Sequence, residues 1–458
     1  MAEQAVIYSQ RVVIGGELRP AALVLEDGQI REVLEVDDLP QDLPARDFGD
    51  QVIMAGLIDP HVHINEPGRT EWEGFETATK AAAAGGITTV VDMPLNSSPV
   101  TTSPDAFEKK LAATHQKLFV DCGFYAGLVP GNSDQLEALL DAGVLGVKAF
   151  LCHSGIDDFP NATEQDLRAA MPILAARNKP LLVHAELVDS EGSDDHDGPD
   201  TPQNYRAYAA ARPQRWELRA IELLLKLVEE TGCHVHIVHL AASEALPMLR
   251  DARERGLPVT VETGPHYLYF ASEEIPDGDT RYKCAPPIRD DKNRRNLLQA
   301  LQNGDIDLVA TDHSPSTPDL KELDSGNLLK AWGGISSLQL LLPVLWTAAK
   351  AEGATIVDVA RWISSAPARL LGLQETLGTI APGRPANLVV WDPDKEFTVD
   401  ADQLHHRHKI TPYEGEMLQG VVNTTFLRGE AIFDATRSPA LLPAPTGHPI
   451  LSTEIEKS

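Results

Sequence analysis

The run VIMAGLIDPHVH (residues 52–63) is the first of eight short apolar runs that determine the fold of this chain. The others are GITTVVDMP (86–94), LFVDCGFYAGL (118–128), VLGVKAF (144–150), PLLVHAE (180–186), VHIVHLA (235–241), VTVET (259–263) and IDLVATDH (306–313). Segments with apolar residues at helical spacing separate them, for example DAFEKKLAATHQK (105–117) and WELRAIELLLKLVEETG (216–232). Apolar runs that alternate with helices are typical of a parallel sheet, and eight parallel strands close a barrel. The sequence therefore predicts an α/β fold, a (β/α)8 TIM barrel, over residues 56–374.

Both chain ends have the pattern of antiparallel strands. In residues 1–55, stretches of β-branched residues are broken by turn signals at Gly15-Gly16 and Asp27-Gly28. Similar stretches return in residues 375–440. We therefore expect a small β-sandwich domain built from both chain ends, 1–55 and 375–440, with the proline-rich stretch 441–458 as a C-terminal tail.

The chain is acidic, because its 458 residues include 68 Asp and Glu against 39 Lys and Arg, a formal net charge of −29. This surplus repels phosphate backbones and anionic lipids, so we expect no nucleic-acid partner and no membrane partner. A hydrophobic content of 43% suits a globular protein. The four cysteines form no C-x-x-C pair, and the first residues, MAEQAVIYSQ, lack the pattern of a signal peptide. We expect a soluble cytoplasmic protein.

Ionisable side chains stand at or near the ends of the predicted barrel strands, on the first, fourth, fifth, sixth and eighth runs. The carboxyl ends of barrel strands open on one face, where barrel enzymes build their active sites. One pocket is therefore expected to collect side chains that lie up to 250 positions apart in the sequence. The set is His61, His63, Lys148, His184, His239 and Asp312.

These residue types predict a metal centre. His61 and His63 are two residues apart in an extended strand, so both imidazoles point to the same side and can share a cation. The full set exceeds the needs of one four-coordinate ion, which indicates two divalent metal ions per subunit, with zinc expected and cobalt, nickel or manganese also compatible. Lys148 suits such a site as a carbamate, because a neutral amine reacts with carbon dioxide and the two new oxygens can bridge two metals. A single histidine is more often structural than a ligand, and the second H-x-H pair, His234 and His236, is assigned no metal role.

Several motifs resemble those of a known family. They are D-P-H-V-H (59–63), T-D-H-S-P (311–315), the long stretch EPGRTEWEGFETATKAAAAGGITTVVDMPLNSSPVTT (66–102), GPHYLYF (264–270), KCAPPIRD (283–290), LKAWGGISSLQ (329–339) and HRHKITPYEGEML (406–418). Together they resemble the cyclic amidohydrolases of the amidohydrolase superfamily, with the greatest similarity to the allantoinase family. The resemblance covers essentially the whole chain.

The resemblance implies a barrel with a small β domain, which agrees with the pattern of the runs. It also implies a binuclear metal centre in which Lys148 is carboxylated (N6-carboxylysine) and the six residues named above are the ligands. The implied reaction is hydrolysis of the cyclic amide of allantoin, a small neutral cyclic ureide, to allantoate in purine degradation. The usual assembly of the family implies a homotetramer.

Neighbouring families give the alternatives: a hydantoinase or dihydropyrimidinase, a dihydroorotase, or a non-enzymatic dihydropyrimidinase-like assembly protein. Dihydroorotases resemble the first motif but carry an arginine for the substrate carboxylate where this chain has Asn65. Ala285 replaces the asparagine that they usually carry before the Pro-Pro pair, and also the serine with which hydantoinases bind substrate. All six ligand positions are filled, which argues against a non-enzymatic member.

Roles follow for a few further residues. Asp312 is placed to take a proton from the attacking hydroxide and deliver it to the leaving ring nitrogen, so we predict it as the catalytic residue. The candidates for substrate binding are Asn65, Ala285, Ser314 and Gly333. Gly333 belongs to a Trp-Gly-Gly stretch that either lets backbone approach the substrate or forms a simple turn. Asp92 and Asn96 either orient metal ligands or are turn residues.

Overall fold

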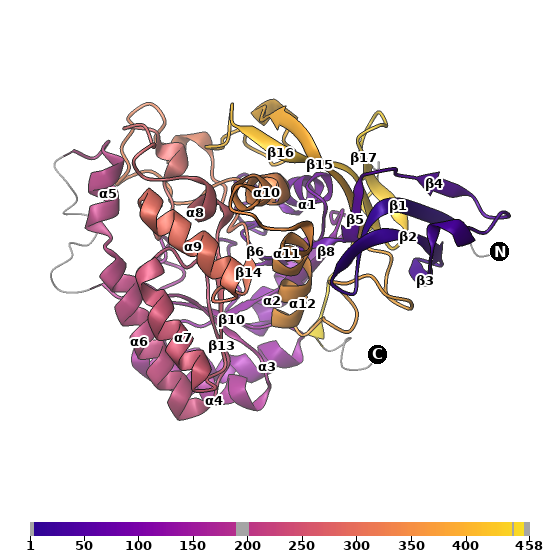
Figure 1. The fold of residues 1–458 in the computed structure, drawn as a ribbon. Helices are drawn as coiled ribbons and strands as arrows, with labels where there is room; N and C mark the ends of the chain where they lie inside the picture. The colour runs from indigo at the N-terminus through magenta and orange to yellow at the C-terminus, as the bar shows by residue number, and fades with distance from the viewer. Residues whose placement is uncertain (1–3, 189–200, 442–443, 453–458) are drawn as a thin grey trace.

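The computed structural model describes residues 4–188, 201–441 and 444–452, and its centre is a barrel of parallel strands (Figure 1). The strands are β6 (Leu57–Val62), β7 (Ile87–Asp92), β8 (Asp121–Phe124) with β9 (Ala126–Gly127), β10 (Val147–Phe150), β11 (Leu181–His184), β12 (Val235–Ile237), β13 (Val259–Thr263) and β14 (Leu308–Val309). Each falls within one predicted run, and β8 and β9 share the third. The ring closes beyond β14, where His63 N donates to His313 O at 2.8 Å and Val62 pairs in parallel with His313. The predicted (β/α)8 barrel is confirmed.

Helices cover the outside of the barrel (Figure 1). They are α1 (Phe75–Ala84), α2 (Pro104–Ala113), α3 (Leu136–Asp141), α4 (Glu164–Ala176), α5 (Tyr205–Ala211), α6 (Gln214–Thr231), α7 (Leu246–Glu254), α8 (Pro265–Tyr269), α9 (Asp291–Asn303), α10 (Leu341–Ala351), α11 (Ile356–Ala360) and α12 (Ala366–Leu370). In α6, Ile221, Leu224 and Val228 recur every three or four residues and are buried, as an amphipathic helix requires. This helix ends at Gly232, whose φ of 68° is left-handed.

Strands from both chain ends share one sheet, in the order β17-β16-β15-β5-β1-β2-β3, with β4 paired to β1. Their bounds are β1 (Gln4–Ile14), β2 (Glu17–Glu26), β3 (Gln29–Leu34), β4 (Ala45–Asp47), β5 (Val52–Ala55), β15 (Leu388–Thr398), β16 (Met417–Leu427) and β17 (Glu430–Asp434). In Figure 1 the indigo first strands lie beside the yellow last ones. The predicted β domain built from both chain ends is therefore confirmed, while its boundaries at residues 55 and 375 stay a prediction.

Residues 444–452 of the predicted tail pack against the barrel. Cys122 N, in β8, donates to His448 O at 3.0 Å, and Ile450 N donates back to Cys122 O at 2.9 Å. The tail segment therefore runs along β8 like an added short strand, in parallel register with Cys122 opposite Pro449.

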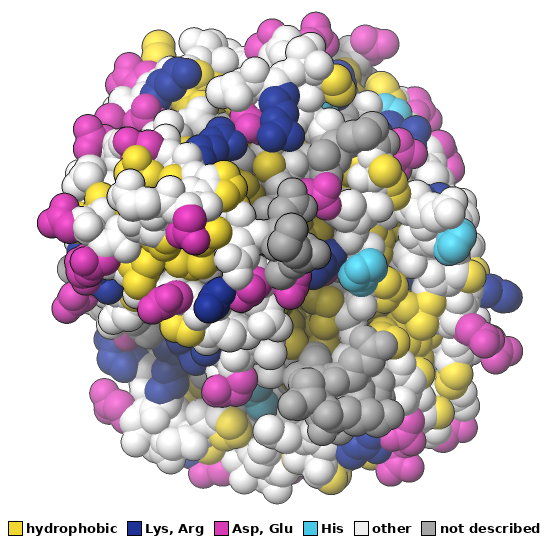
Figure 2. Space-filling model, turned by 90° about the vertical axis from the view of Figure 1, so that its right-hand side faces the viewer, with side chains coloured by type: hydrophobic (Ala, Val, Ile, Leu, Met, Phe, Trp, Pro, Cys, Tyr) yellow, Lys and Arg dark blue, Asp and Glu magenta, His cyan; other side chains and the backbone are white. Residues whose placement is uncertain are grey.

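The surface carries mixed charge. Figure 2 shows the side of the molecule that holds the chain ends, with acidic side chains spread over it and basic side chains among them. Across residues 4–188, 201–441 and 444–452, no helix is both long and apolar enough to cross a membrane.

Candidate metal centre

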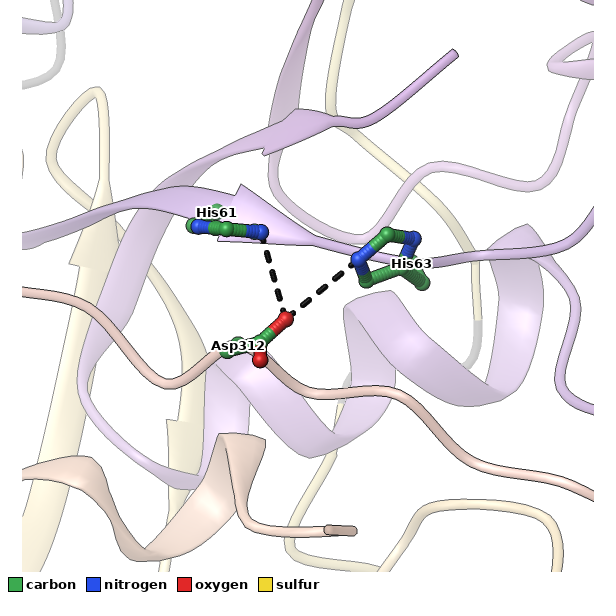
Figure 3. A group of neighbouring side chains, drawn as sticks. All are labelled: His61, His63 and Asp312. Atoms are coloured by element: carbon green, nitrogen blue, oxygen red, sulfur yellow. Dashed lines mark ion pairs between the residues drawn. The ribbon is translucent and has the colours of Figure 1, made fainter. Parts of the chain in front are cut away.

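The end of the first barrel strand and the segment after the eighth bring three ligand-type side chains together (Figure 3). His61 is the penultimate residue of β6 and His63 follows the strand, so their rings lie on the same side with centroids 5.5 Å apart. Asp312 follows β14, and its Oδ1 lies 3.2 Å from His61 Nε2 and 3.3 Å from His63 Nε2. These three side chains therefore turn their ligand atoms toward one point.

The other three predicted ligands complete the site. His184 is the last residue of β11 and His239 lies two residues beyond β12; His184 Nδ1 is 3.1 Å from His239 Nε2. The rings of His239 and His61 have centroids 5.5 Å apart, which joins this pair to the first group. Lys148 comes from β10 and is fully buried. All six predicted ligands line one cavity of about 550 Å³.

Several polar atoms of the predicted ligands have no hydrogen-bond partner. Among the described residues, His61 Nε2, Lys148 Nζ and His239 Nδ1 are buried and make no hydrogen bond. A buried polar atom without a partner costs about 1–3 kcal/mol, so such atoms are rarely left together without a reason. Imidazole nitrogens and a carboxylate oxygen are ligands that zinc and similar divalent ions prefer. The residues therefore fit a metal centre.

The protonation states also suit metal binding, which needs neutral imidazoles and an ionised carboxylate. Burial lowers the pKa of His61, His184 and His239 below their ordinary value, which keeps the rings neutral. Burial would raise the pKa of Asp312, but neighbouring histidines, His61 first, hold it well below its ordinary value. Burial lowers the pKa of Lys148 to about 8, so neutral amine is available near neutral pH.

Buried carboxylates that are not among the predicted site residues hold the ligands in place. Glu262, on β13, accepts hydrogen bonds from His61 Nδ1 and, at 3.2 Å, from the backbone N of His239. Asp59 accepts from the backbone N of His61 and of Thr311, each at 3.2 Å, and so connects the first and eighth strands. The sequence does carry a signal for Glu262: the seventh run, VTVET, places Thr260 and Glu262 on alternate residues, so both side chains face the same side of the strand.

Asp92 supports the site and does not merely form a turn. Its Oδ1 accepts from Ile64 N at 2.9 Å, next to His63, and its Oδ2 pairs with the buried Lys110 Nζ at 2.5 Å. Asn96 lines the cavity and donates from Nδ2 to Asn65 Oδ1 at 3.2 Å. Asp92 was predicted either to orient metal ligands or to be a turn residue. The structure supports the first role, because Asp92 holds the backbone next to His63.

The predicted substrate-binding residues divide into two groups. Ala285, Ser314 and Gly333 line the cavity, on segments that follow β13 and β14. Asn65 is fully buried but is not among the described residues that line the cavity; its Nδ2 donates to Pro315 O at 3.3 Å. Asn65 therefore contacts the loop after Asp312 and, through Asn96, a residue of the cavity wall.

A further group of ligand-type atoms lies beside the cavity. Atoms of Cys152, His184 and Glu186 lie within 4.8 Å of one another, and all three residues are buried. The Glu186 carboxylate oxygen Oε2 lies 2.5 Å from Arg212 Nη2 and 2.7 Å from His184 Nε2. Glu186 therefore supports His184 through its Nε2, whereas Glu262 supports His61 through its Nδ1.

A barrel that gathers four histidines, a lysine and an aspartate at its strand ends defines a metal-dependent hydrolase. The chain belongs to the amidohydrolase family, whose model matches residues 52–432. It is 48% identical over 447 residues to the allantoinase of Arabidopsis thaliana, with 93% of this chain and 87% of that protein covered. It is 47% identical over 434 residues to the allantoinase of Streptomyces avermitilis, with 94% and 95% covered. The L-hydantoinase (dihydropyrimidinase) of Arthrobacter aurescens has a similar structure, with a TM-score of 0.89 and 28% identity over 98% of this chain and 100% of that one.

Proposed function

We propose that this chain hydrolyses the cyclic amide of allantoin to give allantoate, a step of purine and ureide degradation. The observation that carries the proposal is the single cavity lined by all six ligand-type residues. Two relatives named allantoinase, each 47% or more identical over at least 93% of this chain, support allantoin as the substrate.

The proposed centre holds two divalent metal ions, with zinc the expected metal. His61 and His63 would hold one ion and His184 and His239 the other, with Asp312 beside the first pair. Two such ions supply an activated water and polarise the amide carbonyl when they are bound. The neutral amine of Lys148 would attack carbon dioxide, form an N–C bond as one C=O π bond opens, and release a proton, which would leave an anionic carbamate able to supply oxygen ligands to the metal.

Asp312 carries the proton in the proposed reaction. Its ionised carboxylate, whose Oδ1 lies 3.2 Å from His61 Nε2 and 3.3 Å from His63 Nε2, accepts the proton of the water whose oxygen attacks the ring carbonyl. The same carboxyl then donates that proton to the ring nitrogen as the C–N bond breaks. The product leaves as an open-chain acid, and Asp312 returns to its ionised form.

Substrate contacts are proposed for the residues on the segments after β13 and β14. Ser314 offers a hydroxyl, and Ala285 and Gly333 offer backbone groups along the same cavity. Asn65 is proposed to act indirectly, because its side chain holds Pro315 in the loop that carries Ser314. An uncharged ureide needs no arginine fork, which agrees with these neutral partners.

Hydantoin ring opening is the second candidate, and the similarity in structure to an L-hydantoinase favours it. A side-by-side kinetic assay separates the candidates: the metal-loaded protein is given allantoin, hydantoin and dihydroorotate at equal concentrations. We expect kcat/KM to be greatest for allantoin. Faster opening of hydantoin or dihydroorotate would overturn the substrate assignment and leave the metal centre standing.

We also propose a homotetramer, which light scattering on the purified protein would test. A mass of four chains supports it, and a mass of one or two chains contradicts it.

A further inference from the structure

The second H-x-H pair, His234 and His236, has no place among the proposed ligands, yet hydrogen bonds through Thr260 and Glu262 connect both residues to the ligand His61. His236 is fully buried in β12, and His234 precedes the strand and is partly exposed. In the register of the parallel sheet, His236 is the partner of Thr260 on β13. Thr260 and Glu262 are two residues apart on that strand, so both side chains face the same side.

A continuous hydrogen-bonded path connects this pair to His61. His234 Nε2 lies 2.8 Å from Thr260 Oγ1, and the same hydroxyl lies 2.8 Å from His236 Nδ1. His236 Nε2 lies 3.0 Å from Glu262 Oε2. The other carboxylate oxygen of Glu262 contacts His61 Nδ1. The path therefore runs from the partly exposed His234 to a metal ligand.

The direction of every hydrogen bond follows from Glu262. A carboxylate only accepts, so both His61 Nδ1 and His236 Nε2 must carry a proton and donate. A neutral His236 then has a lone pair on Nδ1, so the Thr260 hydroxyl must donate to it. The oxygen of that hydroxyl in turn accepts from His234 Nε2. With neutral rings, this one arrangement of protons satisfies the whole path.

The consequence for His61 is a fixed tautomer. Because its proton sits on Nδ1, its Nε2 carries the lone pair, and Nε2 is the atom that lies 3.2 Å from Asp312 and has no hydrogen-bond partner. Glu262 also accepts from the backbone N of His239, a ligand with a positive φ of 38° that most residues avoid. Glu262 therefore positions two ligands from different strands.

We propose that His234, Thr260, His236 and Glu262 form a relay that fixes His61 in the Nδ1–H tautomer and so presents its Nε2 to the metal. These are positioning residues, since none of the four is a proposed ligand. The inference rests on the metal centre proposed above. It gives the second H-x-H pair a function through hydrogen bonding, without a metal of its own.

The test is the Zn²⁺ affinity of the purified full chain, measured by competition with a chromophoric chelator. Glu262→Gln places an amide N–H against one of the two histidines and is expected to weaken Zn²⁺ binding by about 10–100-fold. Thr260→Val keeps the shape of the side chain but removes the donor to His236, with an expected loss of about tenfold, the lower end of that range. Thr260→Ser keeps the hydroxyl and is expected to restore the affinity.

The outcomes separate the relay from the metal centre. If the unmodified chain binds Zn²⁺ and Thr260→Val binds it equally well, the relay is overturned and the metal centre stands. If the unmodified chain takes up no divalent metal, both are overturned. A neutron crystal structure of the unmodified protein gives a second reading without any variant: deuterium on His61 Nδ1 and His236 Nε2 supports the relay, and deuterium on His61 Nε2 contradicts it.

Discussion

Gly333 and its neighbour Gly334 can be used to test whether the substrate contacts the backbone at Gly333. Alanine at Gly333 would test the substrate contact, and alanine at Gly334 would test the packing of the backbone. Neither has a positive φ, so the backbone of alanine is allowed at both. A Cβ on Gly333 would meet nothing closer than Lys283 Cε at 3.9 Å and Ala285 N at 4.0 Å, which are ordinary contacts. A Cβ on Gly334 would lie 2.2 Å from the backbone oxygen of Ser314, which no rotamer change can move.

The expected effects therefore differ in kind. Gly333→Ala should change the free energy of unfolding by less than about 0.5 kcal/mol, because nothing has to move. Its kcat/KM for allantoin should fall by about 10–100-fold, or about 1.4–2.7 kcal/mol, since the methyl group separates the ring from the backbone. Most of that loss should be a higher KM, because the contact helps substrate and transition state alike. Gly334→Ala should destabilise the protein by about 3 kcal/mol, the upper end for overpacking.

Urea unfolding followed by tryptophan fluorescence, together with kinetics at matched metal content, measures both effects. The Gly334→Ala variant is the matched control, because it adds the same methyl group one residue away. If Gly333→Ala retains the kcat/KM of the unmodified protein, the substrate does not approach this backbone. If Gly334→Ala is as stable as the unmodified protein, the steric reasoning is wrong.

Three further predictions concern single side chains. Lys148→Ala should lose bound metal and activity, and a short carboxylate such as propionate should restore part of both by replacing the carbamate; full metal content in the variant would contradict the bridging role. Asp312→Asn should lower kcat by about 10²–10⁴-fold when compared at equal metal content, and a kcat near that of the unmodified protein would remove Asp312 from proton transfer. Burial lowers the pKa of Lys321 to about 7, against an ordinary value of 10.5. Between pH 7 and pH 10.5 the Lys321 amine is therefore protonated in the unfolded chain and neutral in the folded chain. The free energy of unfolding consequently rises with pH through this window. Lys321→Met should flatten the rise in the free energy of unfolding between pH 7 and pH 9, and an unchanged slope would contradict the assignment.

The barrel and the meeting of the six predicted ligands in one cavity could be predicted because their signals are local. Each strand is a short apolar run with a turn signal, and each ligand stands at or near the end of its run. The barrel rule then places ends of distant runs on one face, so the spatial meeting of His61 and Asp312 needs no further information.

The supporting residues could not be predicted in the same way. Glu262, Asp59 and Glu186 are carboxylates within or beside apolar runs, and their partners depend on which strands are neighbours and in what register. Asn65 was predicted as a substrate contact from its place after the first strand, but its contact with Pro315 O in the loop after Asp312 could not be read from that place. Such details follow from packing and not from the pattern of one segment.

Metal removal and reconstitution test the central claim most directly. Protein stripped with a chelator is titrated with Zn²⁺ in the presence of bicarbonate, and both the bound metal and the rate of allantoin hydrolysis are measured. The six-residue centre predicts that activity is absent without metal and rises until two ions are bound per chain. Full activity in the metal-free protein, or activity that reaches its maximum with one ion bound per chain, would contradict it.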